Sequence, residues 1–527
     1  MTHARNPASA TCVRHAAAAV SLCVALALAT AASANPFALL GYDVESGALA
    51  NSNVSFGSSL GVLYTNPALL ADVGNQAGIA VTFNLPRLDV KLQAKPQSSR
   101  IPTSIYDSSI GNMPGLQDRA LPAAELLNPA SDNEVRDVNA YLGVGMAYNF
   151  GVRRFQLGVL AQLPISSWNS AEVATHFNDE REANFSNKIY LMRFGQWERI
   201  AAVLAGAAYS PLPWLDVGVG AQVSLAAKVR LKLYIPDATV QDYSQSNVGS
   251  EIAGALRPVA GLRFRPLDWL AVGAAWRNES YVSMDGGGGL DLWNYHEPVP
   301  DKLVPKRTTQ KYSMALDYEP MEISVGVGVK LREVTTQVAV MWQQWSQYLD
   351  HHAAHAQSYA EFPSSPFLPV LSDGAYDPTN GGAIDADEYR FNNTFNVQWS
   401  GQWRFKEWGE ASLGACWYPT PAPAQLGRTN FADNDLLGIT AGSRFDFNLL
   451  KLDWTLAVNL QVWQMFERTT YKDPAQVYDE FPDAARTLVA NNPMSEAAGL
   501  QTNNPGYPGY EAGGILVATG FSLMHRF

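Results

Sequence analysis

The sequence predicts an all-β fold, a transmembrane antiparallel β-barrel of about 14 strands. Many segments of about ten residues alternate between apolar and polar positions, and the connections between these segments are alternately short and long. Only 16% of the 527 residues are charged, below the roughly 25% of soluble domains. Beyond the N-terminus no run of about 20 apolar residues occurs, which excludes ordinary transmembrane helices.

Residues 1–34 have the pattern of a signal peptide. Arg5 and Arg14 precede an apolar stretch over 16–29, and Ala-Ser-Ala at 32–34 supplies a cleavage site. We therefore expect export, with the mature protein in the bacterial outer membrane. Cleavage removes two of the three cysteines, so Cys416 remains alone and cannot form an intrachain disulfide.

The strand pattern is clearest over residues 215–225, where odd positions are apolar and even positions are polar or glycine. The predicted strands begin near Gly78, Val138, Phe155, Ile200, Leu215, Leu256, Leu270, Met321, Thr335, Asn396, Glu410, Leu436, Leu452 and Gly513. Long irregular connections are expected over 96–137, 164–185, 235–250, 281–312, 349–393, 419–434 and 469–512. An even number of strands returns both termini to the periplasmic side, together with the short turns.

Aromatic residues support this orientation. Trp214, Trp269, Trp408 and Trp454 each come at or just after a short turn, where they would form one girdle at the membrane interface. The last strand ends on Phe527, a terminal aromatic like those that barrel-assembly machinery recognises. That machinery is an expected partner during biogenesis, and outer-membrane lipid and lipopolysaccharide are expected neighbours.

Composition and motifs exclude several other functions. The net charge is -12 and no block of Lys and Arg is interleaved with aromatic residues, so nucleic acid is not an expected partner. Residues 57–61 match G-x-S-x-G, but no strand and helix flank them as a nucleophile elbow requires. His351, His352 and His355 lie in a long connection, where they could bind a metal but are interpreted as solvated side chains. No enzyme activity and no cofactor are expected.

A calcium-binding loop is one interpretation of residues 377–388. Asp377, Asp385 and Glu388 occupy positions 1, 9 and 12 of an EF-hand-like pattern, with a glycine at position 6. Position 5 is Gly381, which cannot supply a side-chain oxygen. A structural calcium ion and an ordinary acidic turn therefore both remain open.

Several stretches together resemble the FadL/TodX family of outer-membrane transporters for long-chain fatty acids and other hydrophobic compounds. Small residues lead to Asn66-Pro67-Ala68 shortly before the first strand, like the hatch of that family. Similar matches occur at 188–195, 318–327, 342–348 and 418–435. The resemblance implies a signal peptide over 1–34, a hatch over 35–77 that fills the lumen, and a barrel over 78–527.

The resemblance implies passive uptake of long-chain fatty acids or related hydrophobic molecules by a monomer. Such ligands hardly enter a water-filled pore, so a hatch should keep the lumen shut. Exit is expected through a gap beside the third strand, where Gly158 and Pro164 are the weak points.

A ligand carboxylate would need a cation, and Lys188, Arg193 and Arg428 are the candidates. The same three side chains could instead pair with loop acids or lipopolysaccharide, and a hydrocarbon would need no cation.

Three alternative functions stay open. An uptake channel for aromatic or aliphatic hydrocarbons would share the hatch. A polar-solute porin predicts a charged lumen with a constriction loop, whereas the lumen positions here are rich in Gly, Ala, Ser and Gln. A barrel lipase predicts a Ser and a His that meet on the wall, and the sequence offers no such pair.

Overall fold

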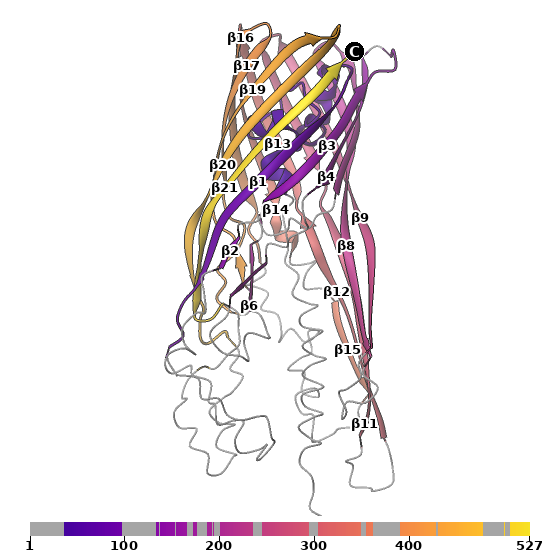
Figure 1. The fold of residues 1–527 in the computed structure, drawn as a ribbon, viewed down its shortest axis with the longest axis vertical. Coiled ribbons are helices and arrows are strands. Elements are labelled where there is room, and N and C mark those ends of the chain that lie inside the picture. Colours follow the sequence, from indigo (N-terminus) through magenta and orange to yellow (C-terminus); the bar gives the residue numbers. More distant parts are fainter. Residues whose placement is uncertain are drawn as a thin grey trace, which may run out of the picture.

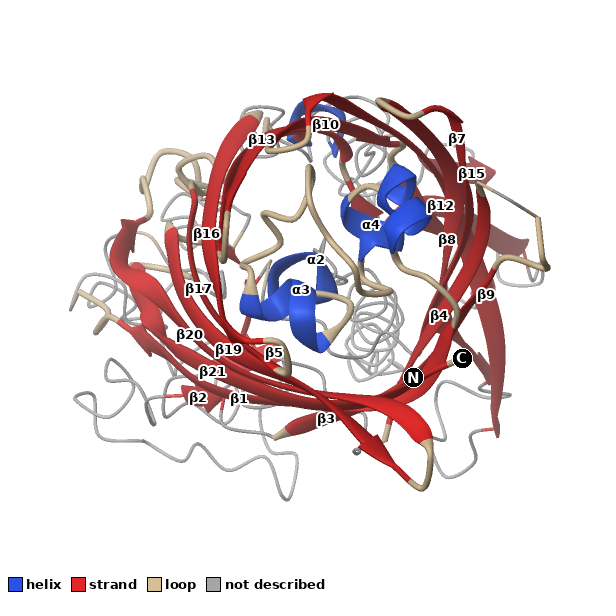
Figure 2. Cartoon of the chain, turned by 90° about the horizontal axis from the view of Figure 1, so that it is seen from above, coloured by secondary structure: helices blue, strands red, loops and turns tan. Residues whose placement is uncertain are grey.

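The computed structural model of the chain describes residues 36–96, 133–135, 138–152, 154–165, 172–175, 187–191, 193, 201–234, 245–294, 304–348, 355–361, 390–427, 430–477, 500 and 506–527. These residues form a closed β-barrel with short helices inside it (Figures 1 and 2). No helix in this part of the chain is long and apolar enough to cross a membrane. The predicted signal peptide, 1–34, lies outside the described residues.

Fourteen antiparallel strands make the wall. The main sheet has 15 strands, of which the three-residue β2 (Asn133–Val135) pairs only with the outer end of β1. The wall strands are β1 (Gln76–Leu92), β3 (Asn139–Tyr148), β4 (Phe155–Pro164), β7 (Ala201–Leu212), β8 (Leu215–Tyr234), β9 (Gln245–Leu267), β10 (Leu270–Arg277), β13 (Met321–Leu331), β14 (Val334–Gln344), β16 (Thr394–Lys406), β17 (Gly409–Tyr418), β19 (Leu436–Leu449), β20 (Leu452–Tyr471) and β21 (Gly509–Arg526). Because β1 pairs with both β21 and β3, the sheet closes on itself.

The predicted number and order of strands are confirmed. Thirteen strands begin within four residues of the predicted position, and six of them at the predicted residue. The exception is β9, which begins at Gln245 instead of Leu256 because it continues the hairpin with β8 beyond the barrel. A hairpin outside the membrane has water available to both faces, so its sequence lacks the alternation that marks a membrane strand.

Apolar side chains cover the outside of the wall. In β8, Asp216, Gln222 and Ser224 are buried, whereas Val219 is 63% exposed. The same alternation occurs in β13, where Glu322 is buried and its neighbours face outward. A wall whose outer face is apolar over this length is matched to lipid rather than to water.

The two ends of the barrel differ as predicted. The short turns and the C-terminus lie at one end, which we call the short-turn end (Figure 1). Trp214, Trp269 and Trp408 are exposed there, with 44%, 46% and 53% of their surface accessible. Trp454 is partly buried and packs on His525, 5.1 Å between ring centroids.

The long connections contain more structure than the sequence predicted. Residues 281–312 were expected to be irregular, but β11 (Ser280–Asn294) and β12 (Val304–Glu319) form a hairpin that extends far from the barrel (Figure 1). β15 (His355–Glu361) adds a third strand to it. A second small sheet joins β5 (Glu172–Thr175), β6 (Asn187–Leu191) and β18 (Phe431–Ala432). The physical reason for the missed strands is again the absence of a lipid face.

Residues 36–75 lie inside the barrel, and we call them the hatch segment (Figure 2). They form α2 (Pro36–Leu40), α3 (Val44–Ala48), α4 (Val62–Thr65) and the 3-10 helix η1 (Pro67–Asp72). The first wall strand begins at Gln76, two residues before the predicted boundary. Asp43 joins the two halves of this segment, because its carboxylate accepts from Ser46 N at 2.7 Å and from Gly61 N at 2.5 Å.

Candidate functional site

Polar side chains of the wall hold the hatch segment by its backbone. Helices of four to six residues leave most of their carbonyl groups without internal partners, so these carbonyls need donors from elsewhere. The wall donates to them through Gln461 Nε2 to Leu40 O (2.7 Å), Asn459 Nδ2 to Val44 O (2.9 Å), Thr440 Oγ1 to Ala48 O (2.7 Å) and Gln162 Nε2 to Tyr42 O. The polar inner face therefore serves as a docking surface for the hatch segment.

Wall glycines let the hatch segment approach the strands at backbone distance. A Cβ atom at Gly273 would lie 1.9 Å from Val54 O, and one at Gly218 would lie 2.2 Å from Ala68 N. Such distances are far shorter than any real carbon contact, so these positions accept no side chain without movement of the hatch segment. The glycines at inward-facing positions of the strands thus make room for the hatch backbone.

Asn66-Pro67-Ala68 lies where the hatch segment meets β9. The Asn66 side-chain amide donates to Val54 O at 2.7 Å and to Leu262 O of the wall at 3.0 Å. Its Oδ1 accepts from Ala68 N at 3.1 Å and so caps η1, whose first residue is Pro67. One asparagine therefore joins two parts of the hatch segment to each other and to the wall.

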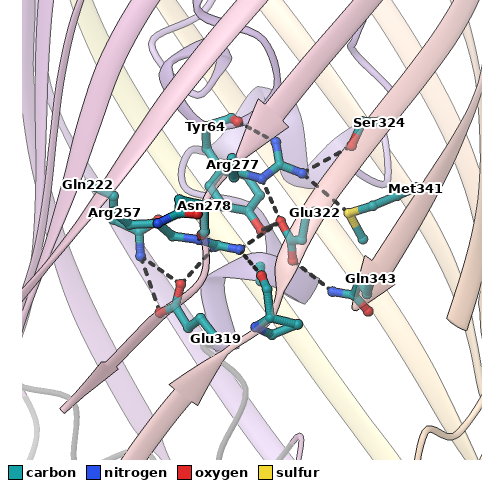
Figure 3. Close-up of polar contacts among 12 residues, drawn as sticks. Tyr64, Gln222, Arg257, Arg277, Asn278, Glu319, Glu322, Ser324, Met341 and Gln343 are labelled. Carbon is teal, nitrogen blue, oxygen red and sulfur yellow. Dashed lines mark hydrogen bonds and ion pairs between the residues drawn. The ribbon is translucent and has the colours of Figure 1, made fainter. Parts of the chain in front are cut away.

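A buried ionic cluster lies next to this contact, on the side away from the short-turn end, which we call the loop side. Figure 3 shows its residues. Arg277 Nε donates to Glu322 Oε2 at 2.5 Å, and Arg277 Nη1 donates to Tyr64 O at 2.7 Å. Arg257 Nη1 donates to Glu319 Oε2 at 2.8 Å, and Arg257 Nη2 is 3.3 Å from Glu322 Oε2. The four charged residues are 1% to 3% exposed. Two cations and two carboxylates balance, which makes their burial tolerable.

Tyr64 connects this ionic cluster to the hatch segment. Its hydroxyl donates to Glu322 Oε2 at 3.2 Å, and the Arg277 guanidinium lies 4.3 Å from its ring centroid. Burial raises the pKa of Tyr64 well above its usual value, and the Glu322 carboxylate adds to the shift. The phenol therefore stays protonated and keeps its donor role.

Two further ion pairs tie the hatch segment to the wall near the short-turn end. Arg263 bonds to Asp72 and, at 2.7 Å, to Asp216 of β8. Arg444 Nη1 lies 3.3 Å from Glu45 Oε2. Burial raises the pKa of Glu45 to about 7, although Arg444 opposes this shift. The Glu45 contact therefore responds to pH near neutrality.

The proposed carboxylate contact Arg193 is buried in an ion pair. Its Nε donates to Asp433 Oδ1 at 2.8 Å, and its other nitrogens donate to Tyr418 O (3.3 Å), Pro419 O (3.2 Å) and Asn434 O (2.5 Å). This is the loop pairing that the sequence left open as the alternative. Lys188 lies in β6, on a backbone that pairs with β5, and its side chain is not described. Arg428 lies outside the described residues.

At the predicted strand-three opening the wall is continuous. Pro164 pairs with Tyr141 at the end of a ladder between β3 and β4, and the ladder between β4 and β7 runs from Phe155 to Gln162. Gly158 lies within both ladders, and its missing side chain makes room for the hatch segment, since a Cβ there would lie 2.8 Å from Leu70 Cδ2.

Of the remaining sequence motifs, the structure describes residues 57–61 in full. Residues 57–61 follow α3 rather than a strand, and the Ser58 hydroxyl accepts from Arg444 at 2.9 Å. Asp377, Asp385 and Glu388 of the proposed calcium loop lie outside the described residues, as do His351 and His352. His355 begins β15, and its side chain is not described.

Sequence reasoning missed the ionic cluster of Arg257, Arg277, Glu319 and Glu322. Arg257, Arg277 and Glu322 occupy lumen positions of predicted strands, where a charge is rare enough to have been a signal. The resemblance quoted the stretch around Glu319 and Glu322 without assigning either residue a partner, because pairing across β9, β10 and β13 depends on strand register.

No family model and no curated protein matches the chain. Similar solved structures include a FadL homologue from Pseudomonas aeruginosa, at 10% identity over 94% of this chain and 98% of that chain, with a TM-score of 0.49. The toluene transporter TodX of P. putida matches at 11% identity over 93% and 99%, with a TM-score of 0.47. The toluene transporter TbuX of Ralstonia pickettii matches at 10% identity over 93% and 100%, with a TM-score of 0.46. At these values the likeness carries no argument about function.

Proposed function

We propose that the protein takes up hydrophobic small molecules across the bacterial outer membrane, with the hatch segment closing the lumen between transport events. The observation that carries this proposal is that the inner face of the wall binds the hatch segment. Its amides and hydroxyls donate to the hatch backbone and its glycines receive that backbone, so they do not line an open aqueous pore. A polar-solute porin would need those groups free for water.

The charge pattern favours an uncharged substrate within this class. Arg257 and Arg277 both contact Glu322, and Arg193 has Asp433. At any of these three described arginines, a ligand carboxylate would have to displace an internal carboxylate, which leaves a buried charge unpaired. We therefore place neutral hydrocarbons ahead of fatty acids, the substrate expected first from the sequence.

We keep lateral exit through the wall in the proposal, but it requires that strand pairing be broken. Opening beside Gly158 would require breaking a ladder of eight residue pairs on either side of β4. Movement of the hatch segment away from the same strand breaks no wall pairing, so we propose that it precedes any lateral step.

Binding to the refolded mature chain, residues 35–527, tests the function. The probe is labelled toluene, with oleyl alcohol and oleate as competitors that share a chain and differ in charge. Ion conductance is recorded on the same preparation. We expect saturable binding, stronger competition by the alcohol than by oleate, and little conductance.

Two results would change the proposal. Preferential competition by oleate would restore the fatty-acid assignment. Absence of binding by any of the three compounds, together with a large steady conductance, would leave a general porin.

A further inference from the structure

Aromatic side chains cross the lumen on the loop side of the ionic cluster. The Tyr510 hydroxyl at the start of β21 donates to Phe431 O at 3.3 Å. The Phe431 ring packs on Phe391 (5.6 Å between centroids) and on Tyr348 (6.2 Å). Tyr348 in turn packs on Tyr318 at 5.5 Å, just before β13. All five residues are at most 6% exposed.

This aromatic row bridges nearly opposite sides of the barrel. In the order of the wall, β21 is followed by β20, β19, β17, β16, β14 and then β13, so β13 is six steps away in a closed ring of fourteen strands. Phe431 belongs to none of these strands, because it lies in the connection between β17 and β19. We call residues 430–435 of this connection the strap.

Arg193 binds the strap at both a side chain and the backbone. Arg193, which follows β6, pairs with Asp433 at 2.8 Å and donates to Asn434 O at 2.5 Å. It also binds the carbonyls where β17 ends, Tyr418 O and Pro419 O. The backbone link between β6 and the strap consists of two parallel residue pairs, Phe431 with Tyr190 and Ala432 with Leu191.

This backbone link is short compared with the ladders of the wall. The wall ladders beside β4 contain eight residue pairs each, whereas β18 and β6 share two. Parallel pairing is also slightly less stable per residue than antiparallel pairing. Arg193 adds charged hydrogen bonds to this short link, beside the bonds from Asn434 Nδ2 to Ala512 O (2.7 Å) and from Thr420 Oγ1 to Asp433 Oδ2 (2.8 Å).

We propose that the strap is the entry gate of the lumen, and that substrate passes when residues 430–435 separate from Arg193 and β6. The proposal rests on the proposed function for the identity of the substrate. It does not depend on the substrate for its test, because the chain carries its own probe. Cys416 in β17 is 3% exposed, lies two residues before Tyr418, whose carbonyl Arg193 binds, and is the only cysteine beyond residue 34.

The first experiment measures the rate at which a maleimide alkylates Cys416 in the refolded mature chain. Asp433→Asn removes the carboxylate that pairs with Arg193, and we expect alkylation to be about tenfold faster or more. Arg404→Gln is the matched control, because Arg404 is 58% exposed and 3.8 Å from Glu410 at the other end of the barrel. The heat-dependent gel shift of a folded barrel verifies that each variant folds.

The second experiment locks the gate. Leu191 and Ala432 are Cα partners in adjacent parallel strands, about 4.8 Å apart, within the range that a disulfide can bridge. In the oxidised Leu191→Cys/Ala432→Cys variant we expect Cys416 alkylation and labelled toluene entry to slow at least about tenfold, with toluene entry restored by dithiothreitol.

The outcomes separate the gate from the proposed function. Unchanged Cys416 alkylation in both the Asp433→Asn variant and the oxidised variant would overturn the gate, whatever the substrate proves to be. Slower alkylation of the locked variant, without toluene binding by the wild type, would support the gate and overturn the hydrocarbon assignment.

Discussion

A single methyl group at Gly273 should loosen the hatch segment while leaving the barrel folded. In Gly273→Ala the new Cβ would lie 1.9 Å from Val54 O and 3.1 Å from Asn66 Nδ2. The wall at this point is an antiparallel ladder with partners on both sides, so the hatch backbone is the part that gives way. It has to move by more than about 1 Å to reach ordinary van der Waals distance.

The cost can be estimated from two contributions. Overpacking of a close contact costs about 1 to 3 kcal/mol. The displacement also stretches the hydrogen bonds from Asn66 to Val54 O and Leu262 O, each with a net contribution of about 0.5 to 1.5 kcal/mol. Docking of the hatch segment should therefore weaken by at least about 2 kcal/mol, or about 30-fold in its equilibrium.

Conductance of the purified protein in planar bilayers measures this effect. We expect transient openings in Gly273→Ala and few in the wild type. Gly401→Ala is the control, because a Cβ there meets only Trp399 ring atoms at 3.5 and 3.7 Å. A Gly273→Ala barrel that folds, conducts as little as the control and keeps the same thermal stability would refute the close-contact reasoning.

Three further changes test the other contacts of the hatch segment. Asn66→Ala removes both amide bonds and should cost about 1 to 3 kcal/mol of docking, seen as faster proteolysis of the hatch segment, whereas unchanged proteolysis would contradict the role of Asn66. Glu322→Gln leaves two buried arginines short of a carboxylate and should cost about 3 kcal/mol, visible as a lower Tm; Arg404→Gln should leave the Tm within a degree or so. The pKa of Glu45 is raised by burial to about 7 from 4.5, so docking is most stable below about pH 4.5 and weakens as pH rises through about 7. The rate of hatch proteolysis in the wild type should therefore rise between pH 5 and 8, and in Glu45→Gln it should not change with pH. The same pH profile in both proteins would exclude Glu45 as the source of the trend.

The wall of the barrel could be predicted from the sequence because lipid imposes a simple rule. Every second residue of a membrane strand must be apolar, and this rule located thirteen of the fourteen strands to within four residues. The rule stops where the membrane stops. The hairpin of β11 and β12 and the early start of β9 both lie beyond it, and both were missed.

The sequence by itself determined the strand count, the direction of the strands and the inner parity rich in glycine, serine and glutamine. Only the tertiary structure showed the role of these inward-facing residues. Gly273 and Gly218 are explained by the hatch backbone, which lies directly against them. Charges behave in the same way. The sequence identified Arg193 as a candidate cation for a ligand. Its actual partner, Asp433, lies 240 residues further along the chain and could not be identified without the fold. A period-two pattern is local, so it can be recognised strand by strand along the sequence. Contacts between side chains inside the lumen depend on the strand register and closure of the whole barrel.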